Sequence, residues 1–177
     1  MEAVVCQGGR RRLLCQRMSA QTSPSDPKIV QIDPERDVGD FHAALAIREV
    51  VFIEEQAVPP SIERDEEDAG AYHCLAWVGG HPVGTGRLVA LPAPPAGEAG
   101  PWSQIGRMAV LAAHRGTGLG AKILVFLEAH ARAEARAGIL LHAQKHAAGF
   151  YEKMGYVLFG EEFEEAGIPH IKARKRL

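Results

Sequence analysis

Apolar and polar residues recur with two periods along this chain, and the two periods predict helices and strands. From Asp40 and again from Leu119, apolar side chains return every three or four residues, which is the spacing of one face of an α-helix. Short apolar runs bounded by glycine, proline or aspartate predict strands. The expected helices cover residues 40–58, 118–137 and 145–154, and the expected strands cover residues 29–32, 72–78, 83–91, 104–111, 139–142, 156–161 and 170–174.

The order of these elements predicts a mixed sheet. Residues 79–82 (Gly-Gly-His-Pro) have the composition of a hairpin turn, so the strands on either side should pair antiparallel. The helix over 118–137 connects two strands, and such a β-α-β unit is expected to be parallel and right-handed. Residues 1–27, which include Arg10-Arg11-Arg12 and show no lasting periodicity, are expected to form a disordered tail ahead of one domain over 28–177.

The stretch after the expected strand 104–111 carries the clearest chemistry. Residues 115–120 read Arg-Gly-Thr-Gly-Leu-Gly and lead directly into a helix. Glycine lets successive N–H groups turn toward one space, and the first N–H groups of a helix have no partner within it. Together these features predict a cradle for a phosphate or pyrophosphate. The loop lacks both the Gly-Lys-Ser/Thr ending of a Walker A motif and the G-x-G-x-x-G spacing of a dinucleotide-binding turn.

Composition narrows the class of protein. The chain has 177 residues, 46% of them hydrophobic, which suits one domain with a core but not two of ordinary size. A net charge of −2 and apolar runs too short for a bilayer argue against nucleic-acid binding and a membrane span. Cys6, Cys15 and Cys74 lack metal-site spacing and fit a reducing cytosol. His142 and His146 are separated by an expected strand-to-helix junction and have no third ligand nearby, so no metal is expected.

Three motifs in this chain resemble those of the GNAT (Gcn5-related N-acetyltransferase) superfamily. The Arg-x-x-Gly-x-Gly pattern of residues 115–120 resembles its acyl-CoA pyrophosphate loop, and residues 106–110 (Gly-Arg-Met-Ala-Val) resemble its fourth strand. Residues 150–156 (Phe-Tyr-Glu-Lys-Met-Gly-Tyr) are similar to its F-Y-x-K-x-G-F/Y signature. Within the superfamily, the chain resembles the ElaA-type branch, and the matching segments are residues 48–52, 55–59, 141–144 and 167–171.

The resemblance implies an α+β (mixed α/β) fold, a single three-layer α-β-α domain whose mixed sheet splays between its fourth and fifth strands. It also implies acetyl-CoA as co-substrate, with the pantetheine arm paired along the fourth strand, the pyrophosphate held by the glycine loop, and no metal. The residues that the resemblance places against acetyl-CoA are Met108, Ala109, Val110, Arg115, Gly116, Thr117, Gly118, Leu119, Gly120, Gln144 and Tyr151.

Tyr151 is the expected general acid. The CoA sulfur leaves as an anion when an amine attacks the thioester, and a tyrosine hydroxyl, with an ordinary pKa of about 10, is protonated at neutral pH and can supply a proton. The resemblance does not indicate the general base. Many superfamily members carry a glutamate on the fourth strand for this role, but residues 104–110 contain no carboxylate. Glu55 and His170 are the preferred candidates. The alternatives are Glu54, Asp65, Asp68 and His73.

The sequence therefore predicts transfer of an acetyl group from acetyl-CoA to a primary amine on a small molecule, a protein or a peptide. The acidic stretch 63–68 favours a cationic acceptor. Two other functions stay open, a non-catalytic acyl-CoA sensor and an acyl-homoserine-lactone-synthase-like acyltransferase. The second is suggested by a resemblance to the ion-paired floor of those synthases, carried by Arg48, Phe52, Glu63, Asp65, Asp68 and Arg87. The identity of the acceptor and the oligomeric state, a homodimer included, also stay open.

Overall fold

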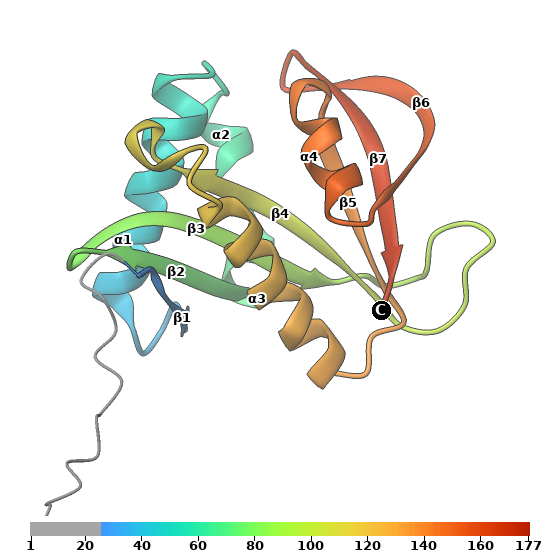
Figure 1. Ribbon diagram of the computed structural model, residues 1–177, viewed down its shortest axis with the longest axis horizontal. Coiled ribbons are helices and arrows are strands. Elements are labelled where there is room, and N and C mark those ends of the chain that lie inside the picture. Colours follow the sequence, from blue (N-terminus) through green and yellow to red (C-terminus); the bar gives the residue numbers. More distant parts are fainter. Residues whose placement is uncertain (1–25) are drawn as a thin grey trace, which may run out of the picture.

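The structure, a computed structural model, describes residues 26–177, which form one seven-stranded sheet with helices on both faces (Figure 1). The expected disordered tail lies, up to residue 25, outside the described residues. The strands are β1 (Lys28–Ile32), β2 (Tyr72–Val78), β3 (His81–Ala90), β4 (Trp102–Val110), β5 (Gly138–Gln144), β6 (Val157–Glu165) and β7 (Ile168–Arg176). The α-helices are α1 (Val38–Arg48), α2 (Pro60–Glu63), α3 (Leu119–Ala133) and α4 (Ala148–Lys153).

The sheet is mixed, as expected, with the strand order β1-β2-β3-β4-β5-β7-β6. β4 and β5 are parallel and are connected through α3, while the other neighbouring strands run antiparallel. The hairpin predicted around residues 79–82 joins β2 to β3. The fold class is therefore confirmed.

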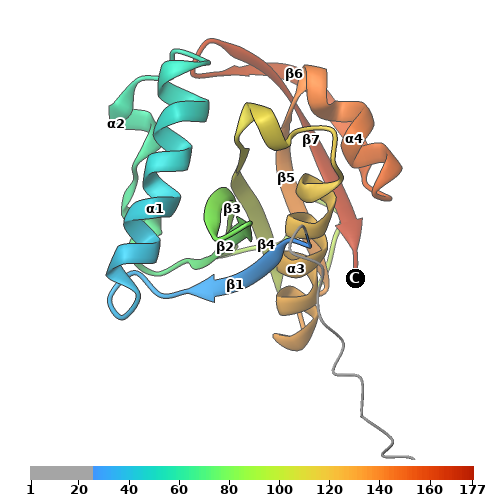
Figure 2. The same cartoon turned by 60° about the vertical axis from the view of Figure 1, so that its left-hand side comes forward.

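Helices cover the two faces of the sheet separately, so the domain has three layers (Figure 2). α1 packs on one face, where Ala44 and Ile47 meet Leu75 of the sheet. α3 packs on the opposite face, where Ile123, Leu124 and Leu127 are fully buried. Because each helix buries one apolar stripe, the period seen in the sequence corresponds to the observed packing.

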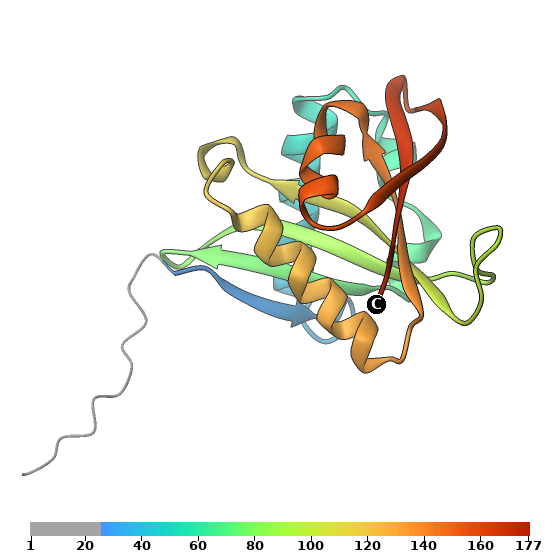
Figure 3. The same cartoon turned by 45° about the vertical axis from the view of Figure 1, so that its right-hand side comes forward.

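β4 and β5 pair only at their first residues and then diverge. Their register covers Trp102 to Gln104 of β4 against Gly138 to Leu140 of β5. Beyond this point the two strands separate like the arms of a V (Figures 1 and 3). β4 also has an irregular register against β3 next to Arg107, whose backbone has a positive φ of 52°. The predicted splay is thus confirmed, and it leaves the β5-facing edge of β4 without a neighbouring strand beyond Gln104.

The elements differ from the predicted ones mainly at their ends. The helix expected over 40–58 is α1 followed by a π-helical turn, η1 (Glu49–Glu54). The helix expected over 145–154 is a 3₁₀ turn, η4 (Lys145–Ala147), and then α4. The sequence pattern did not predict α2 or the 3₁₀ turns η2 (Glu66–Ala69) and η3 (Ala112–His114), because such short turns show no apolar period.

Candidate functional site

The space between the diverging strands is a cavity of about 760 Å³. Its walls come from η1, α2, β3, β4, the glycine loop, α3, β5, α4 and the β6–β7 hairpin. The volume falls within the range usual for small-molecule sites. The site residues expected from the sequence that line this cavity are Met108, Val110, Arg115, Gly116, Gly118, Gly120, Gln144, Tyr151 and His170. Ala109, Thr117, Leu119 and Glu55 do not line it.

The glycine loop presents a row of backbone N–H groups to this cavity. Gly118 precedes α3 in the left-handed conformation, with φ of 84°, which glycine adopts without strain. Within residues 26–177, the N–H groups of residues 116–120 donate to no backbone or side-chain acceptor. Free N–H groups at the start of a 15-residue helix favour an anion. The loop therefore has the geometry of the predicted pyrophosphate cradle.

Arg115 is held beside the cradle by two contacts. Its Nε donates to the backbone carbonyl of Val110 over 2.8 Å, and its Nη2 donates to Oε2 of Glu55 over 2.6 Å. The structure therefore places Glu55 on the guanidinium of Arg115 and outside the cavity wall. Nothing in this arrangement directs the Glu55 carboxylate toward an acceptor amine, so its role as the base stays a prediction with little geometric support.

The open edge of β4 supplies the second part of the site. Residues 105–110 have no strand on their β5-facing side, and Met108 and Val110 line the cavity while Ala109 is buried under α1. Backbone groups on a free strand edge pair readily with an extended ligand. A pantetheine arm, with its two amides, suits this edge.

Tyr151 lies on α4, at the wall of the cavity opposite β4. Its hydroxyl is 3.9 Å from the sulfur of Met108, across the splay. Burial raises the pKa of Tyr151 to about 12. The phenol is therefore protonated at neutral pH and able to donate a proton into the cavity.

Gln144 and His170, two further residues predicted from the sequence, also line the cavity. Gln144 at the end of β5 donates from Nε2 to Oε1 of Gln56 over 2.8 Å, which links β5 to the segment between η1 and α2. His170 on β7 is 8% exposed and pairs through Nδ1 with the carbonyl of Ile168 at 2.8 Å. Because a carbonyl only accepts, Nδ1 of His170 carries the proton. Both residues stay predictions as site residues.

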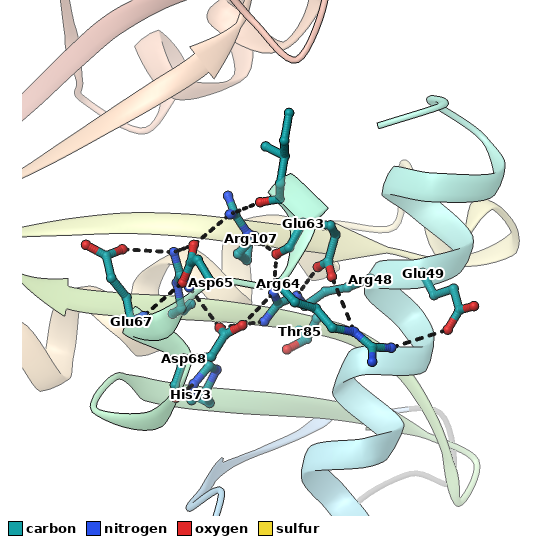
Figure 4. A network of polar contacts seen from close by, with 12 residues as sticks. Arg48, Glu49, Glu63, Arg64, Asp65, Glu67, Asp68, His73, Thr85 and Arg107 are labelled. Carbon is teal, nitrogen blue, oxygen red and sulfur yellow. Dashed lines mark hydrogen bonds and ion pairs between the residues drawn. The ribbon is translucent and has the colours of Figure 1, made fainter. Parts of the chain in front are cut away.

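The acidic stretch 63–68 is folded into a network of ion pairs rather than a solvated loop (Figure 4). Arg48, 1% exposed, pairs with Glu63 and, over 2.8 Å, with Asp68. Arg87 pairs with Asp65 over 2.5 Å and with Asp68 over 2.8 Å. The expected ion-paired floor is therefore present.

This network touches the cavity and reaches β4. Arg107 Nη2 donates to Asp65 over 2.8 Å, and its Nε donates to the Glu63 carbonyl over 2.9 Å. Burial alone would raise the pKa of Asp68, but the hydrogen bonds and charges of Arg48 and Arg87 bring it to about 2. Glu63, Arg87 and Arg107 line the cavity wall, so the network forms one of its ends.

One pair at the cavity wall was missed at the sequence level. His142 Nδ1 lies 2.8 Å from Oε2 of Glu165, and both side chains line the cavity. The sequence had raised His142 only as a metal ligand. A usable signal was its place on β5, since His142 and Gln144 are two residues apart and so share one face of the strand.

In the part of the chain that the structure describes, no three His, Cys, Asp or Glu side chains converge as metal ligands would. Among the same residues, no helix is long and apolar enough to cross a bilayer.

Comparisons with known proteins show which family this chain is similar to. An acetyltransferase (GNAT) domain model matches residues 39–177. The uncharacterised N-acetyltransferase YjcF of Bacillus subtilis is 38% identical over 133 residues, which cover 75% of this chain and 89% of YjcF. Protein ElaA of Escherichia coli is 31% identical over 139 residues, covering 77% of this chain and 88% of ElaA. An acyl-CoA N-acyltransferase structure from Pseudomonas aeruginosa has a TM-score of 0.70 at 29% identity and covers 85% of this chain and 99% of that one.

A splayed mixed sheet, an open strand edge and an N–H-lined loop define the class of acyl-CoA N-acyltransferases. Within that class, the chain belongs to the GNAT acetyltransferase superfamily and to its ElaA-type branch. The same fold holds CoA compounds in other proteins, such as the CoA-dependent acyl-homoserine lactone synthase BjaI with SAM and isopentyl-CoA. BjaI has a TM-score of 0.65 at 18% identity, with 85% of this chain and 83% of BjaI covered, a likeness of fold alone.

Proposed function

We propose that this protein transfers the acetyl group of acetyl-CoA to a primary amine, with Tyr151 as the general acid. The observation that carries the proposal is that the Tyr151 hydroxyl, the open edge of β4 and the glycine-loop N–H groups all belong to one cavity. An acyl donor whose pyrophosphate occupies the loop and whose pantetheine follows β4 would bring its thioester toward Met108 and Tyr151.

The reaction is then a direct attack of the amine on the thioester carbonyl. The C–N bond forms, the C–S bond breaks, and Tyr151 gives its proton to the departing sulfur. Holding both reactants in one slot supplies a further part of the rate, because the attack becomes effectively intramolecular. The acceptor is a cationic amine in this proposal, since Glu67 and Glu165 add carboxylates to the cavity wall. Its identity, as a small molecule or as a protein or peptide amine, is to be found by screening.

Replacement of Tyr151 by phenylalanine tests the role of the hydroxyl. In Tyr151→Phe, calorimetric affinity for acetyl-CoA should stay at the wild-type level, while amine-dependent thiol release should fall about 100-fold, as expected when a general acid is lost. Tyr156→Phe is the matched control, because the Tyr156 hydroxyl is buried away from the cavity. Wild-type turnover in Tyr151→Phe would remove Tyr151 from the mechanism. Acetyl-CoA binding without turnover on any amine in the wild type would instead support the sensor function.

A second function is an acyl-homoserine-lactone-synthase-like acyl transfer. It is favoured by the buried network of Arg48, Glu63, Asp68 and Arg87, which resembles the ion-paired floor of those enzymes and forms one end of the cavity. Donor choice separates the two functions. Thiol release from acetyl-CoA with simple amines supports the acetyltransferase, whereas a requirement for a long acyl donor together with S-adenosylmethionine supports the synthase.

A further inference from the structure

His142 and Glu165 form a hydrogen-bonded pair at the wall of the cavity. His142 is on β5, past the last residue that pairs with β4, and its side chain is 28% exposed. Glu165 ends β6, and its carboxylate lies 2.8 Å from the imidazole. The hydrogen bond from His142 lowers the pKa of Glu165, so this carboxylate is ionised at neutral pH.

The pairing determines which nitrogen of His142 is basic. An ionised carboxylate only accepts hydrogen bonds, so Nδ1 carries the proton and donates it to Glu165. The lone pair of the neutral imidazole is then on Nε2, which accepts no hydrogen bond from residues 26–177. The ring is held edge-on against Phe163 at 4.9 Å between centroids. This is the arrangement in which a carboxylate orients a histidine that acts as a base.

We propose that His142 is the general base that removes a proton from the acceptor ammonium, and that Glu165 positions the imidazole and stabilises its charged form. The proposal rests on the proposed acetyl transfer. The ammonium gives one proton to Nε2 of His142, which passes it to water. The resulting amine forms the C–N bond as the C–S bond breaks. The nitrogen loses its second proton as the amide forms, and this proton replaces the one that Tyr151 gives to the sulfur.

Other charged groups around His142 fit this role less well. His170 is only 8% exposed, and its Nδ1 proton goes to a neutral carbonyl, so nothing comparable balances an imidazolium there. Lys172 pairs with His142 in the β5–β7 register and has its ammonium 5.9 Å from the Phe163 ring centroid. Arg107 acts on the pair from β4, where its charge helps to lower the pKa of Glu165. Arg107 thus helps to keep the Glu165 carboxylate ionised without replacing the base.

The test compares His142→Gln, Glu165→Gln and the control His81→Gln, whose histidine is exposed at the β2–β3 turn. The probe is the amine that gives the fastest thiol release from acetyl-CoA with the wild type. His142→Gln should lower kcat/KM for this amine about 100-fold and should abolish the acid limb of its pH profile. Glu165→Gln should lower kcat for this amine and leave its KM at the wild-type value, because the imidazole loses the carboxylate that accepts its Nδ1 proton and orients the ring. His81→Gln should behave as the wild type.

Two further measurements distinguish loss of the base from a folding defect in the variants. Calorimetric affinity for acetyl-CoA should be the same in all these variants, and added imidazole should restore turnover in His142→Gly by taking the vacated place. Wild-type kcat/KM in His142→Gln, no response to imidazole, or loss of the acid limb in His170→Gln instead would each overturn the assignment while acetyl transfer stands. Absence of thiol release by the wild type with every amine would overturn acetyl transfer, and the base with it.

Discussion

Trp102 and Gly138 lie opposite each other where β4 and β5 join, and the indole of Trp102 occupies the space that a Cβ on residue 138 would need. Such a Cβ would be 2.5 Å from Cη2 of Trp102, a side chain that is 1% exposed. The Trp102 Nε1 also donates to the carbonyl of Ala99 over 3.2 Å, so the ring cannot easily move aside. This contact lies at the point of the V from which the cavity opens.

Substitution of Gly138 by alanine should therefore destabilise the protein. We expect the free energy of unfolding in Gly138→Ala to fall by about 1–3 kcal/mol, because the methyl group overpacks a rigid, buried ring. Gly106→Ala on β4 is the control, since a Cβ there meets nothing within 4 Å. Urea unfolding of the two variants measures the difference. Equal stability would show that the strand junction adapts without cost.

Gly118→Trp should block the anion cradle. The residue has φ of +84° and open space around its Cβ direction, so the indole would enter the region in front of the loop N–H groups. Gly80→Trp is a control for backbone strain, because Gly80 has φ of +81°, equally open surroundings and a place in the β2–β3 turn outside the cavity wall. We expect calorimetric affinity for acetyl-CoA to be lost in Gly118→Trp and retained in Gly80→Trp. Tight binding by both would place the pyrophosphate elsewhere.

Because Arg115 and Glu55 form an ion pair beside the glycine loop, their replacement should have opposite effects on the affinity for acetyl-CoA. In Arg115→Ala, loss of a charge-assisted hydrogen bond to the pyrophosphate should weaken acetyl-CoA binding about tenfold. Glu55→Gln should tighten it, because Glu55 Oε2, 2.6 Å from Arg115, competes with the pyrophosphate for the guanidinium. Titration calorimetry of both variants tests this. A fall in kcat of Glu55→Gln at unchanged affinity would speak for Glu55 as the base.

The buried network predicts an acid-sensitive stability. Asp68 has a pKa of about 2 in the folded protein, below its ordinary value of 3.8, so the stabilisation it gives is complete above about pH 4 and is lost as the pH falls toward 2. The shift corresponds to about 2 kcal/mol. Asp68→Asn should flatten this part of the curve of unfolding free energy against pH. Parallel curves for the two proteins would mean that Asp68 does not control the acid transition.

Replacement of Arg48 in the buried network should lower the free energy of unfolding by more than protonation of Asp68 does. Arg48→Met leaves Glu63 without its buried cation and Asp68 with Arg87 alone, and we expect a loss of about 3–5 kcal/mol because a buried charge then lacks compensation. Arg36→Met is the control, since Arg36 makes an exposed pair with Asp33. Chemical unfolding at neutral pH measures both. A loss in Arg48→Met no larger than in Arg36→Met would show that water compensates the network.

The glycine loop and the F-Y-x-K-x-G-F/Y signature could be recognised from the sequence, because each is a run of residues that are consecutive in the chain. Alternate glycines permit the left-handed turn at Gly118 wherever the segment lies, and the helix that follows supplies its own N–H groups. The apolar periods likewise located α1, α3 and most strands. Element ends were less accurate, since short turns such as α2 have no period of their own.

The pairs that complete the site could not be read in this way. His142 and Glu165 are 23 residues apart in the sequence. They come together because β7 pairs with both β5 and β6, the strands that carry them. Their contact depends on the register of the β6–β7 hairpin, in which Glu165 pairs with Ile168, and a slip of one residue would turn Glu165 to the other face. The sequence by itself thus determined the order of helices and strands through its apolar period, and the class of fold through its resemblance to the GNAT superfamily. It also determined a glycine turn with free N–H groups, because that turn arises from local backbone preference. Only the tertiary structure decided which charges meet across the cavity, because strand register and the splay of β4 from β5 set distances between residues remote in sequence.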